Sequence, residues 1–236
     1  MKIIAGTLAL LLWAHGLEAQ TEKKAAFVTA EQLAVASVLP FPPTADSTMM
    51  KEELRQLHKL QETRTAAQVE QAKQDDVDES IFLFKGVLGD RFDRKALPLT
   101  ALLSDHVHND EGIIVNPAKT FFARPRPYQF DATIKPVCKA TSVVPDAFPS
   151  GHATTGYLEA FVLAMIVPER RNEILARADE YAQNRLICGV HYASDLVASK
   201  GVAYAMIGLM MQHPQFKQEL EAARTETRRA LGLTSR

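Results

Sequence analysis

Runs rich in helix-forming residues dominate this chain, and the alternation of apolar and polar residues that marks a strand is almost absent. Alanine, leucine, glutamate, glutamine and lysine recur in these runs, which favours helix over sheet. Hydrophobic residues make up 47% of the 236 residues and charged residues 23%, the balance of an ordinary globular protein. We therefore expect an all-α bundle, and the length suits a single domain.

Capping signals and apolar spacing predict where the helices begin and end. Asn116-Pro117 suits a helix start, Asn172 suits another, and Gly189 suits the position just past a helix end. The segment from Thr48 to Gln74 has sparse apolar and dense charged residues, which indicates a long, exposed amphipathic helix. The remaining helices are expected at residues 80–88, 97–107, 116–122, 151–167, 172–187, 191–211 and 214–231.

The first nineteen residues have the layout of a secretory signal peptide. Lys2 precedes an apolar run of about ten residues, too short to cross a bilayer of about 30 Å, and Leu17 and Ala19 suit a cleavage site. A buried first helix is the alternative interpretation. We expect a signal peptide at residues 1–19, one mature all-α domain at residues 20–236, and a periplasmic or secreted protein without a membrane span.

Export changes how Cys138 and Cys188 are interpreted. In an oxidising compartment two cysteines are more often paired than free, although two buried thiols are the alternative. Two cysteines also exclude a disulfide-framework mini-protein and a four-cysteine zinc site. The formal net charge of −1 gives no strong field toward nucleic acid or an anionic membrane, so phosphate binding would need locally placed cations.

Three clusters of polar residues could carry chemistry, and the first runs from Lys119 to Pro127. Pro125 and Pro127 force the residues before them out of the α region. A helix that bears Lys119 should therefore end there, and an extended segment should present Arg124 and Arg126. A solvated basic loop is the alternative.

The second cluster, Phe148-Pro149-Ser150-Gly151-His152, stands immediately before a helical run. Glycine lets the backbone turn sharply. Ser150 and the free N–H groups of the helix start would then form an anion-binding corner, with His152 in the first turn beside it.

The third cluster runs from Arg185 to Asp195. Arg185 should face the core and needs an anionic partner there, because its charge cannot be removed by deprotonation. His191 and Asp195 are four residues apart, on one face of a helix. A carboxylate in that position fixes the ring tautomer and makes the other nitrogen a better nucleophile, although a surface ion pair is the alternative. Residues that share the helix face of Arg185 are Ile174, Ala178 and Tyr181.

Together, these cations, the helix-start nest and two histidines indicate phosphoryl transfer. The positive groups would hold the phosphoryl oxygens and neutralise the charge that builds up in the transition state. One histidine would attack in line, and the other would protonate the leaving oxygen.

The order and spacing of the three motifs resemble the signature of the type 2 phosphatidic acid phosphatase superfamily, which also includes vanadium haloperoxidases. The motifs are Lys119-x6-Arg126-Pro127, Pro149-Ser150-Gly151-His152 and Arg185-x5-His191-x3-Asp195. The segments 148–152 and 187–191, together with the signal peptide, are similar to bacterial class A non-specific acid phosphatases.

This resemblance implies an exported, metal-independent acid phosphatase that hydrolyses a broad range of phosphomonoesters, with nucleotide diphosphohydrolase or phosphotransferase side activity as a further option. It implies that His191 forms a phosphohistidine, that Asp195 orients it, and that His152 acts as general acid and later as base. The implied phosphate ligands are Lys119, Arg126, Ser150, Gly151 and Arg185. No cofactor and no nucleic acid polymer are expected, while assembly into a homo-oligomer stays open.

The pattern has one departure and one rival. Asn184 stands where the family usually has serine, so it is not expected to bind phosphate. Arg124 competes with Arg126, but its spacing fits less well. The run from Asp105 to Asp110 suggests a metal site, yet His106 and His108 point to nearly opposite sides of a helix.

Other functions compete with the phosphatase hypothesis. A vanadium-dependent haloperoxidase would use the same anion cradle, and a non-enzymatic module would bind phosphate and release none. A membrane-lipid phosphatase is disfavoured by the lack of spans. The phosphatase mechanism needs neutral His191 and protonated His152, which unperturbed histidine pKa values near 6.5 allow in mildly acidic solution, with a bell-shaped rate profile.

Overall fold

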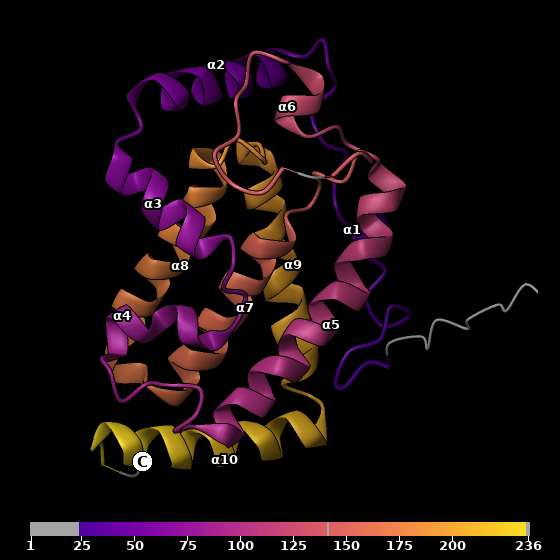
Figure 1. Cartoon of the computed structure of the whole chain (residues 1–236). Coiled ribbons are helices and arrows are strands. Elements are labelled where there is room, and N and C mark those ends of the chain that lie inside the picture. The colour runs from indigo at the N-terminus through magenta and orange to yellow at the C-terminus, as the bar shows by residue number, and fades with distance from the viewer. Residues whose placement is uncertain (1–23, 141, 235–236) are drawn as a thin grey trace, which may run out of the picture.

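One apolar helix, α7 (Gly151–Ile166), lies at the centre of the fold, and most of its residues are buried. A helix that is apolar on all sides is stable only when other elements surround it. Its neighbours are α5 (Pro98–Phe122), α8 (Arg171–Ile187), α9 (Ala193–Met210) and α10 (Pro214–Leu231). In Figure 1, α10 crosses one end of this bundle and α2 (Thr48–Thr63) crosses the opposite end.

The computed structural model describes residues 24–140 and 142–234, and the regular elements in these ranges are all helical, as predicted. The predicted signal peptide at residues 1–19 lies outside the described residues. None of the described helices combines the length and the apolarity that crossing a bilayer requires. The shorter elements are α1 (Val35–Val38), α3 (Ala66–Asp75), the 3₁₀ turn η1 (Ile81–Phe84), α4 (Lys85–Leu88), α6 (Pro127–Phe130) and the 3₁₀ turn η2 (Pro168–Arg170).

The single helix expected over residues 48–74 is wrong, because the chain breaks there into α2 and α3. Thr65 caps α3: its hydroxyl accepts from the Gln68 backbone N–H at 3.2 Å, and the Gln68 side chain accepts from the Thr65 N–H at 2.8 Å. This reciprocal capping box starts a new helix within two residues of the previous one. The break turns α3 toward α8, against which it packs.

The two helices expected at residues 97–107 and 116–122 are one continuous helix, α5, with Pro117 inside it. Proline in a helix interior removes one hydrogen bond and costs about 3 kcal/mol. Here the apolar stripe continues across it, since Val107, Ile114, Val115 and Ala118 are all buried. Burial of each of the valine and isoleucine side chains contributes about 1.5–3 kcal/mol, which together outweighs the proline.

The two ends of α8 give one correction and one confirmation. Asn172 does not cap α8, because the 3₁₀ turn η2 leads directly into the helix at Arg171. Gly189 does lie just past its end, with φ of +74°, a region that side chains with a Cβ rarely adopt. That turn reverses the chain sharply and brings the residues that follow α8 back toward the bundle.

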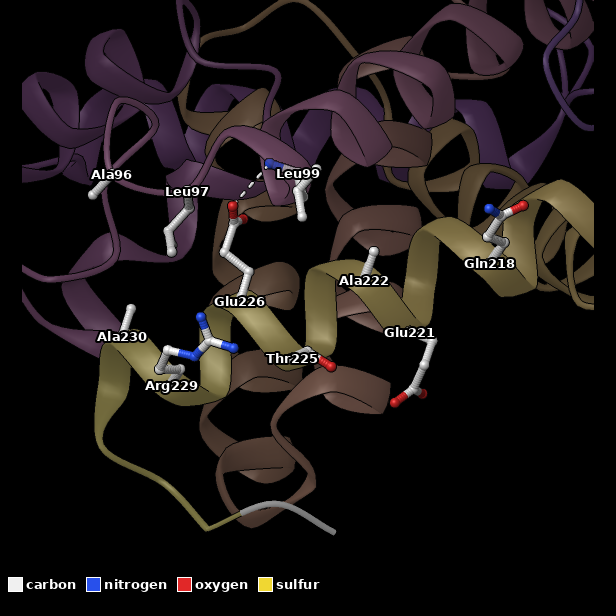
Figure 2. Close-up of a pocket in the computed structure, with 10 residues that line it drawn as sticks. All are labelled: Ala96, Leu97, Leu99, Gln218, Glu221, Ala222, Thr225, Glu226, Arg229 and Ala230. Atoms are coloured by element: carbon white, nitrogen blue, oxygen red, sulfur yellow. Dashed lines mark hydrogen bonds between the residues drawn. The ribbon is translucent and has the colours of Figure 1, made fainter.

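A hollow of about 740 Å³ lies between α10 and the segment that enters α5. Figure 2 shows the carboxylate of Glu226 directed at the first turn of α5. It accepts from the backbone N–H groups of Leu99 at 3.1 Å and Thr100 at 2.9 Å. Leu97, the N-cap residue of α5, offers no side-chain cap, so Glu226 satisfies these donors instead. This hollow therefore holds a structural contact between two helices.

Candidate active site

A smaller cavity, of about 320 Å³, opens where the end of α3, the start of α6, the first turn of α7 and the last turn of α8 meet. The three predicted motifs, far apart in the sequence, all reach it or its walls. Its lining residues are Asp76, Glu79, Arg126, Tyr128, Lys139, Ser142, Asp146, His152 and Arg185.

His191 lies behind this cavity, in the turn before α9, and is only 1% exposed. The expectation that it shares a helix face with Asp195 is wrong, because α9 begins two residues later, at Ala193. The predicted contact nevertheless forms, since its Nδ1 is 3.2 Å from Asp195 Oδ2. The same nitrogen is 2.9 Å from the carbonyl oxygen of Ala147, a partner that the motif did not reveal.

The partners of the ring fix the tautomer of His191. Arg126 Nη1 lies 3.2 Å from Nε2, and a guanidinium can only donate, so Nε2 must accept with its lone pair. The proton is then on Nδ1, where the Ala147 carbonyl and the Asp195 carboxylate both accept it. The ring thus turns an unprotonated nitrogen toward a cationic side chain of the cavity.

Burial sets the ionisation of this pair. It lowers the pKa of His191 well below its usual range, and the charges of Arg126 and Arg185 lower it further. Burial also raises the pKa of Asp195 to about 7, although Arg124 opposes that rise. A neutral His191 is therefore the stable form in the absence of an anion.

Arg126 links His191 to the cavity mouth. Its Nε donates to Asp146 Oδ1 at 2.6 Å and its Nη2 donates to Asp146 Oδ2 at 3.2 Å. Burial opposes the ionisation of Asp146, but these bonds outweigh it and its pKa lies below the ordinary value. The guanidinium is thus held as a fork, with its Nη1 edge facing Nε2 of His191.

Lys119 reaches the site from the last turn of α5, and its ammonium lies beside Gly151. A Cβ at residue 151 would lie 3.4 Å from Lys119 Nζ and 3.2 Å from Glu111 Oε1, so a larger residue here would press on these two side-chain ends. Burial lowers the pKa of Lys119, while the charge of Glu111 works against that change.

Ser150, which is expected to form an anion-binding corner with the start of a helix, is the N-cap of α7. Its hydroxyl oxygen accepts from the Ala153 N–H at 3.4 Å, and its own N–H donates to Ser199 Oγ at 2.9 Å. The hydroxyl proton of Ser150 is not engaged in that cap. With the N–H of Gly151 in the first turn, it forms a donor set at a helix N-terminus, which suits an anion.

Arg185 is buried at the opposite wall and has the predicted anionic partner. Its Nη1 donates to Asp76 Oδ1 at 2.7 Å, and its buried Nε has no hydrogen-bond partner among the described residues. The neighbouring Asn184 does not line the cavity. Its side-chain amide donates to Asp75 Oδ2 at 2.7 Å and so ties α8 to α3. The position where the family usually has serine thus holds a contact between α8 and α3 in this chain.

His152 lies in the first turn of α7, near the open side of the cavity. Its Nε2 is 3.3 Å from Glu79 Oε1 and 3.2 Å from the carbonyl oxygen of Asp76. Burial lowers its pKa well below the usual value, and the charge of Arg185 adds to that effect. A bound anion would oppose both influences, because a negative charge favours the protonated ring.

Arg124, the rival of Arg126, points away from the cavity. It is 4% exposed and donates to Glu53 Oε2 at 2.7 Å and to Asp195 Oδ1 at 2.5 Å. The sequence did not reveal the carboxylates that line or support the site, because they come from loops and helices outside the motifs. These carboxylates are Glu53, Asp76, Glu79 and Asp146.

The predicted disulfide is present between Cys138 and Cys188. It joins the loop that carries Lys139 and Ser142 to the end of α8, so it ties one wall of the cavity to the helix of Arg185. In the described part of the chain, the one set of side chains close enough to share a metal ion is Asp76 with these two cysteines. Both sulfurs are taken up by the disulfide.

The acidic residues and histidines between Asp105 and Asp110 in α5 contact separate partners. Asp105 pairs with Arg94, while His106 lies 2.9 Å from Glu219 on α10. His108 contacts Thr155 at 3.4 Å. Asp110 accepts from the backbone N–H groups of residues 26, 27 and 28. These side chains therefore hold the bundle together.

Comparison with known proteins agrees with this geometry. Residues 100–219 match the model of the PAP2 superfamily. The chain is 28% identical to the non-specific acid phosphatase of Providencia stuartii, over 80% of this chain and 79% of that protein. It is also 28% identical to the non-specific acid phosphatase of Salmonella typhimurium, over 80% and 78% of the two chains. An acid phosphatase of Zymomonas mobilis is 30% identical over 60% of this chain and 54% of its own length.

The fold is also similar to a solved structure. The transmembrane PAP2 type phosphatidylglycerolphosphate phosphatase from Bacillus subtilis superposes with a TM-score of 0.52 at 15% sequence identity. The match covers 76% of this chain and 90% of that one. The predicted family, the distant homology to bacterial non-specific acid phosphatases and the all-helical fold are thereby confirmed. The chain belongs to the PAP2 superfamily.

Proposed function

We propose that this protein is an exported acid phosphatase that hydrolyses phosphomonoesters through a phosphohistidine at His191. Its enzyme class, an acid phosphatase of the PAP2 family, follows from the family match and from the acid phosphatases that it resembles. A signal peptide at residues 1–19 would direct the mature domain, residues 20–236, to the periplasm or the medium. The observation that carries the mechanism is the fixed tautomer of His191, with Nε2 unprotonated and 3.2 Å from Arg126.

In the first step, the lone pair on His191 Nε2 attacks phosphorus in line with the leaving oxygen. The new bond is N–P, and the P–O bond to the leaving group breaks with its electron pair on oxygen. The Nδ1 proton stays in place, so the positive charge that develops on the ring faces the Asp195 carboxylate, 3.2 Å away. His152, protonated before attack, delivers its proton to the leaving oxygen.

In the second step, the roles reverse. Neutral His152 takes a proton from water, the water oxygen attacks phosphorus, and the N–P bond breaks with its pair returning to His191. Phosphate leaves with the proton balance restored. Lys119, Arg126 and Arg185 neutralise the charge on the phosphoryl oxygens throughout, and the N–H of Gly151 and the hydroxyl of Ser150 add uncharged donors.

These three cationic side chains supply the charge that a metal ion supplies in other phosphatases, so we expect turnover to survive chelation with EDTA. A cavity of about 320 Å³ that opens to solvent suits small phosphate esters and places few demands on the leaving group. A broad range of phosphomonoesters follows, with alcohols able to replace water in the second step.

Rapid quench with a labelled phosphomonoester tests the mechanism. We expect a phosphoenzyme that is stable in base and labile in acid, and that disappears in the His191→Ala variant. Phosphate release without any trapped intermediate would overturn the phosphohistidine route. Halide oxidation with vanadate and peroxide, and no ester hydrolysis, would instead make the protein a haloperoxidase.

A further inference from the structure

Arg124 sits in a buried cluster of charges behind the nucleophile, two residues from Arg126 but on the other side of the chain. Its Nη1 donates to Asp195 Oδ1 at 2.5 Å and to Ser194 Oγ at 2.7 Å. Its Nη2 donates to Glu53 Oε2 at 2.7 Å. Because the three charged side chains are each no more than 6% exposed, water does not screen them.

The two oxygens of Asp195 have separate partners. Oδ1 accepts from Arg124, while Oδ2 accepts from the Tyr192 backbone N–H at 2.8 Å and lies 3.2 Å from His191 Nδ1. A carboxylate held at both ends cannot rotate about its last bond. Arg124 is itself held, since its guanidinium lies 4.0 Å from the centre of the Tyr192 ring.

The same contacts favour the charged form of Asp195 against the burial that raises its pKa. A buried ion needs a partner of opposite sign, because its hydration is lost. Arg124 is the cation that touches Asp195 directly. Without it, the protonated form of Asp195 would gain, and the Nδ1–H of His191 would keep only the Ala147 carbonyl as a strong acceptor.

Glu53 brings α2 into the same cluster. Its Oε1 accepts from the Ser194 N–H at 2.6 Å, and its Oε2 accepts from Arg124. One cation is therefore shared between two carboxylates. The negative charge of Glu53 draws on Arg124 and so weakens its hold on the charge of Asp195.

We propose that Arg124 is a positioning residue of the reaction: it keeps Asp195 ionised and rotated toward His191, and Glu53 sets the strength of that effect. The assignment rests on the proposed role of His191 as nucleophile. Arg124 forms and breaks no covalent bond, and it does not touch the phosphate cavity.

Because Arg124 and Glu53 carry opposite charges, removing one or the other should shift the pH dependence of kcat/KM in opposite directions. Removing the positive charge of Arg124 makes the pair of His191 and Asp195 hold its proton more tightly, so the acid limb of kcat/KM should move to higher pH. Removing the negative charge of Glu53 should move the same limb to lower pH. The charged and titratable groups around this pair are Arg124 from the segment after α5, Glu53 from α2, Lys119 from α5, Arg126 from the start of α6, His152 from α7 and Arg185 from α8.

The experiment compares Arg124→Met, Arg124→Lys and Glu53→Gln with the wild-type enzyme between pH 4 and pH 9. We expect Arg124→Met to lower kcat by about 10²-fold, as a misplaced nucleophile does. Its acid limb should rise by about one pH unit, while inhibition by inorganic phosphate changes little. Arg124→Lys should recover part of both losses, and Glu53→Gln should shift the limb downward.

Arg228→Met is the matched control. Arg228 is also 4% exposed and pairs with Glu169 at 2.9 Å, but it lies on α10, at the far end of the bundle. Its loss should lower the melting temperature and leave the acid limb in place. If Arg124→Met does not fold, Arg124→Lys and Glu53→Gln still carry the test.

A second readout does not depend on turnover. The ¹⁵N spectrum of the His191 ring should show Nδ1 protonated in the wild-type protein and a mixture of tautomers in Arg124→Met. This spectrum still tests Arg124 if the wild-type protein proves to form no phosphoenzyme. Two results would overturn the role of Arg124: an unchanged ring spectrum with an unmoved acid limb in a folded Arg124→Met variant, or shifts of the same sign in Arg124→Met and Glu53→Gln.

Discussion

The two histidines of the cavity lie in contrasting surroundings. His191 is 1% exposed and is held by a backbone carbonyl, a buried carboxylate and a guanidinium. The side chain of His152 is 23% exposed, and the Glu79 carboxylate beside it is 34% exposed. A nucleophile gains from a fixed tautomer, whereas an acid that later acts as a base must exchange protons with water. We call the buried surroundings of His191 the dry side of the cavity and the more exposed surroundings of His152 its open side. These two environments match the two demands.

The arginines of the cavity are held in place in a different way from the histidines. Arg126 and Arg185 are each already paired with a carboxylate, Asp146 at 2.6 Å and Asp76 at 2.7 Å. In the proposed mechanism, these pairs would hold the guanidiniums in place before phosphate binds, so less order would have to be created on binding. The site is thus preorganised by hydrogen bonds around His191 and by ion pairs at the two guanidiniums that are proposed to bind phosphate.

The largest loss should come from the dry side. We expect His191→Ala to lower kcat on the order of 10⁵-fold, the scale that removal of a covalent nucleophile produces. No phosphoenzyme should be trapped, while inorganic phosphate still binds, as isothermal titration calorimetry would measure. A variant that still forms an acid-labile phosphoenzyme would place the nucleophile on another residue.

His152→Ala tests the open side and should have the next largest effect. General acid catalysis contributes about 10²–10⁴-fold, and that loss should appear in full with alkyl phosphates, whose leaving oxygens need a proton. With p-nitrophenyl phosphate, whose leaving group is stable as an anion, formation of the phosphoenzyme should suffer much less. Equal losses of the phosphorylation rate for both substrates would remove His152 from the role of acid.

Arg185→Ala should affect binding more than chemistry. A charge-assisted hydrogen bond contributes about 1.5–3 kcal/mol, so we expect the inhibition constant of inorganic phosphate to rise about 10- to 100-fold. Arg177→Ala is a suitable control, since Arg177 on the same helix pairs with Asp75 and does not line the cavity. The phosphate affinity of that control should stay near that of the wild type. Unchanged phosphate affinity in Arg185→Ala would contradict its assignment as a ligand.

The motifs predicted the dry side better than the open side, for a physical reason. Lys119, Arg126, Gly151 and His191 are set by local spacing and by helix ends, which a sequence records directly. The carboxylates Asp76, Glu79 and Asp146 come from connecting segments, whose position depends on how whole helices pack. The family spacing favours Arg126 over Arg124, and Arg126 does line the cavity, but the buried carboxylates that hold Arg124 away from it could not be predicted from the spacing.

The predictions of helix ends also succeeded where the cause lies in the neighbouring residues and failed where it lies in distant packing. Signals of the immediate chain correctly predicted that a helix begins at residue 151 and that Gly189 lies just past a helix end. The continuity of α5 through Pro117 could not be predicted from the dipeptide Asn116-Pro117, because it depends on a buried apolar stripe that the rest of the bundle creates.

The smallest effect on the reaction is expected from a second buried carboxyl, that of Glu159. Glu159 in α7 is fully buried and accepts from Ser104 Oγ at 2.6 Å, but no cation contacts it among the described residues. Burial raises the pKa of Glu159 to about 8, as it raises the pKa of Asp195 to about 7 against the opposing charge of Arg124.

The sign of the stability effect follows from that raised pKa. Below about pH 4.5 the side chain of Glu159 is protonated in both the folded and the unfolded chain, so its full contribution is present. As pH rises from about 4.5 toward 8, the unfolded chain releases this proton first, and the free energy of unfolding falls by about 1.4 kcal/mol per pH unit. Glu159→Gln keeps the group neutral and should remove that part of the slope, with kcat unchanged. Urea unfolding at pH 5 and pH 8 measures this, with Glu221→Gln, an exposed carboxyl on α10, as control. Parallel pH slopes in Glu159→Gln and the wild type would mean that Glu159 is already ionised in the fold, and that a buried carboxyl here needs no arginine to keep its charge.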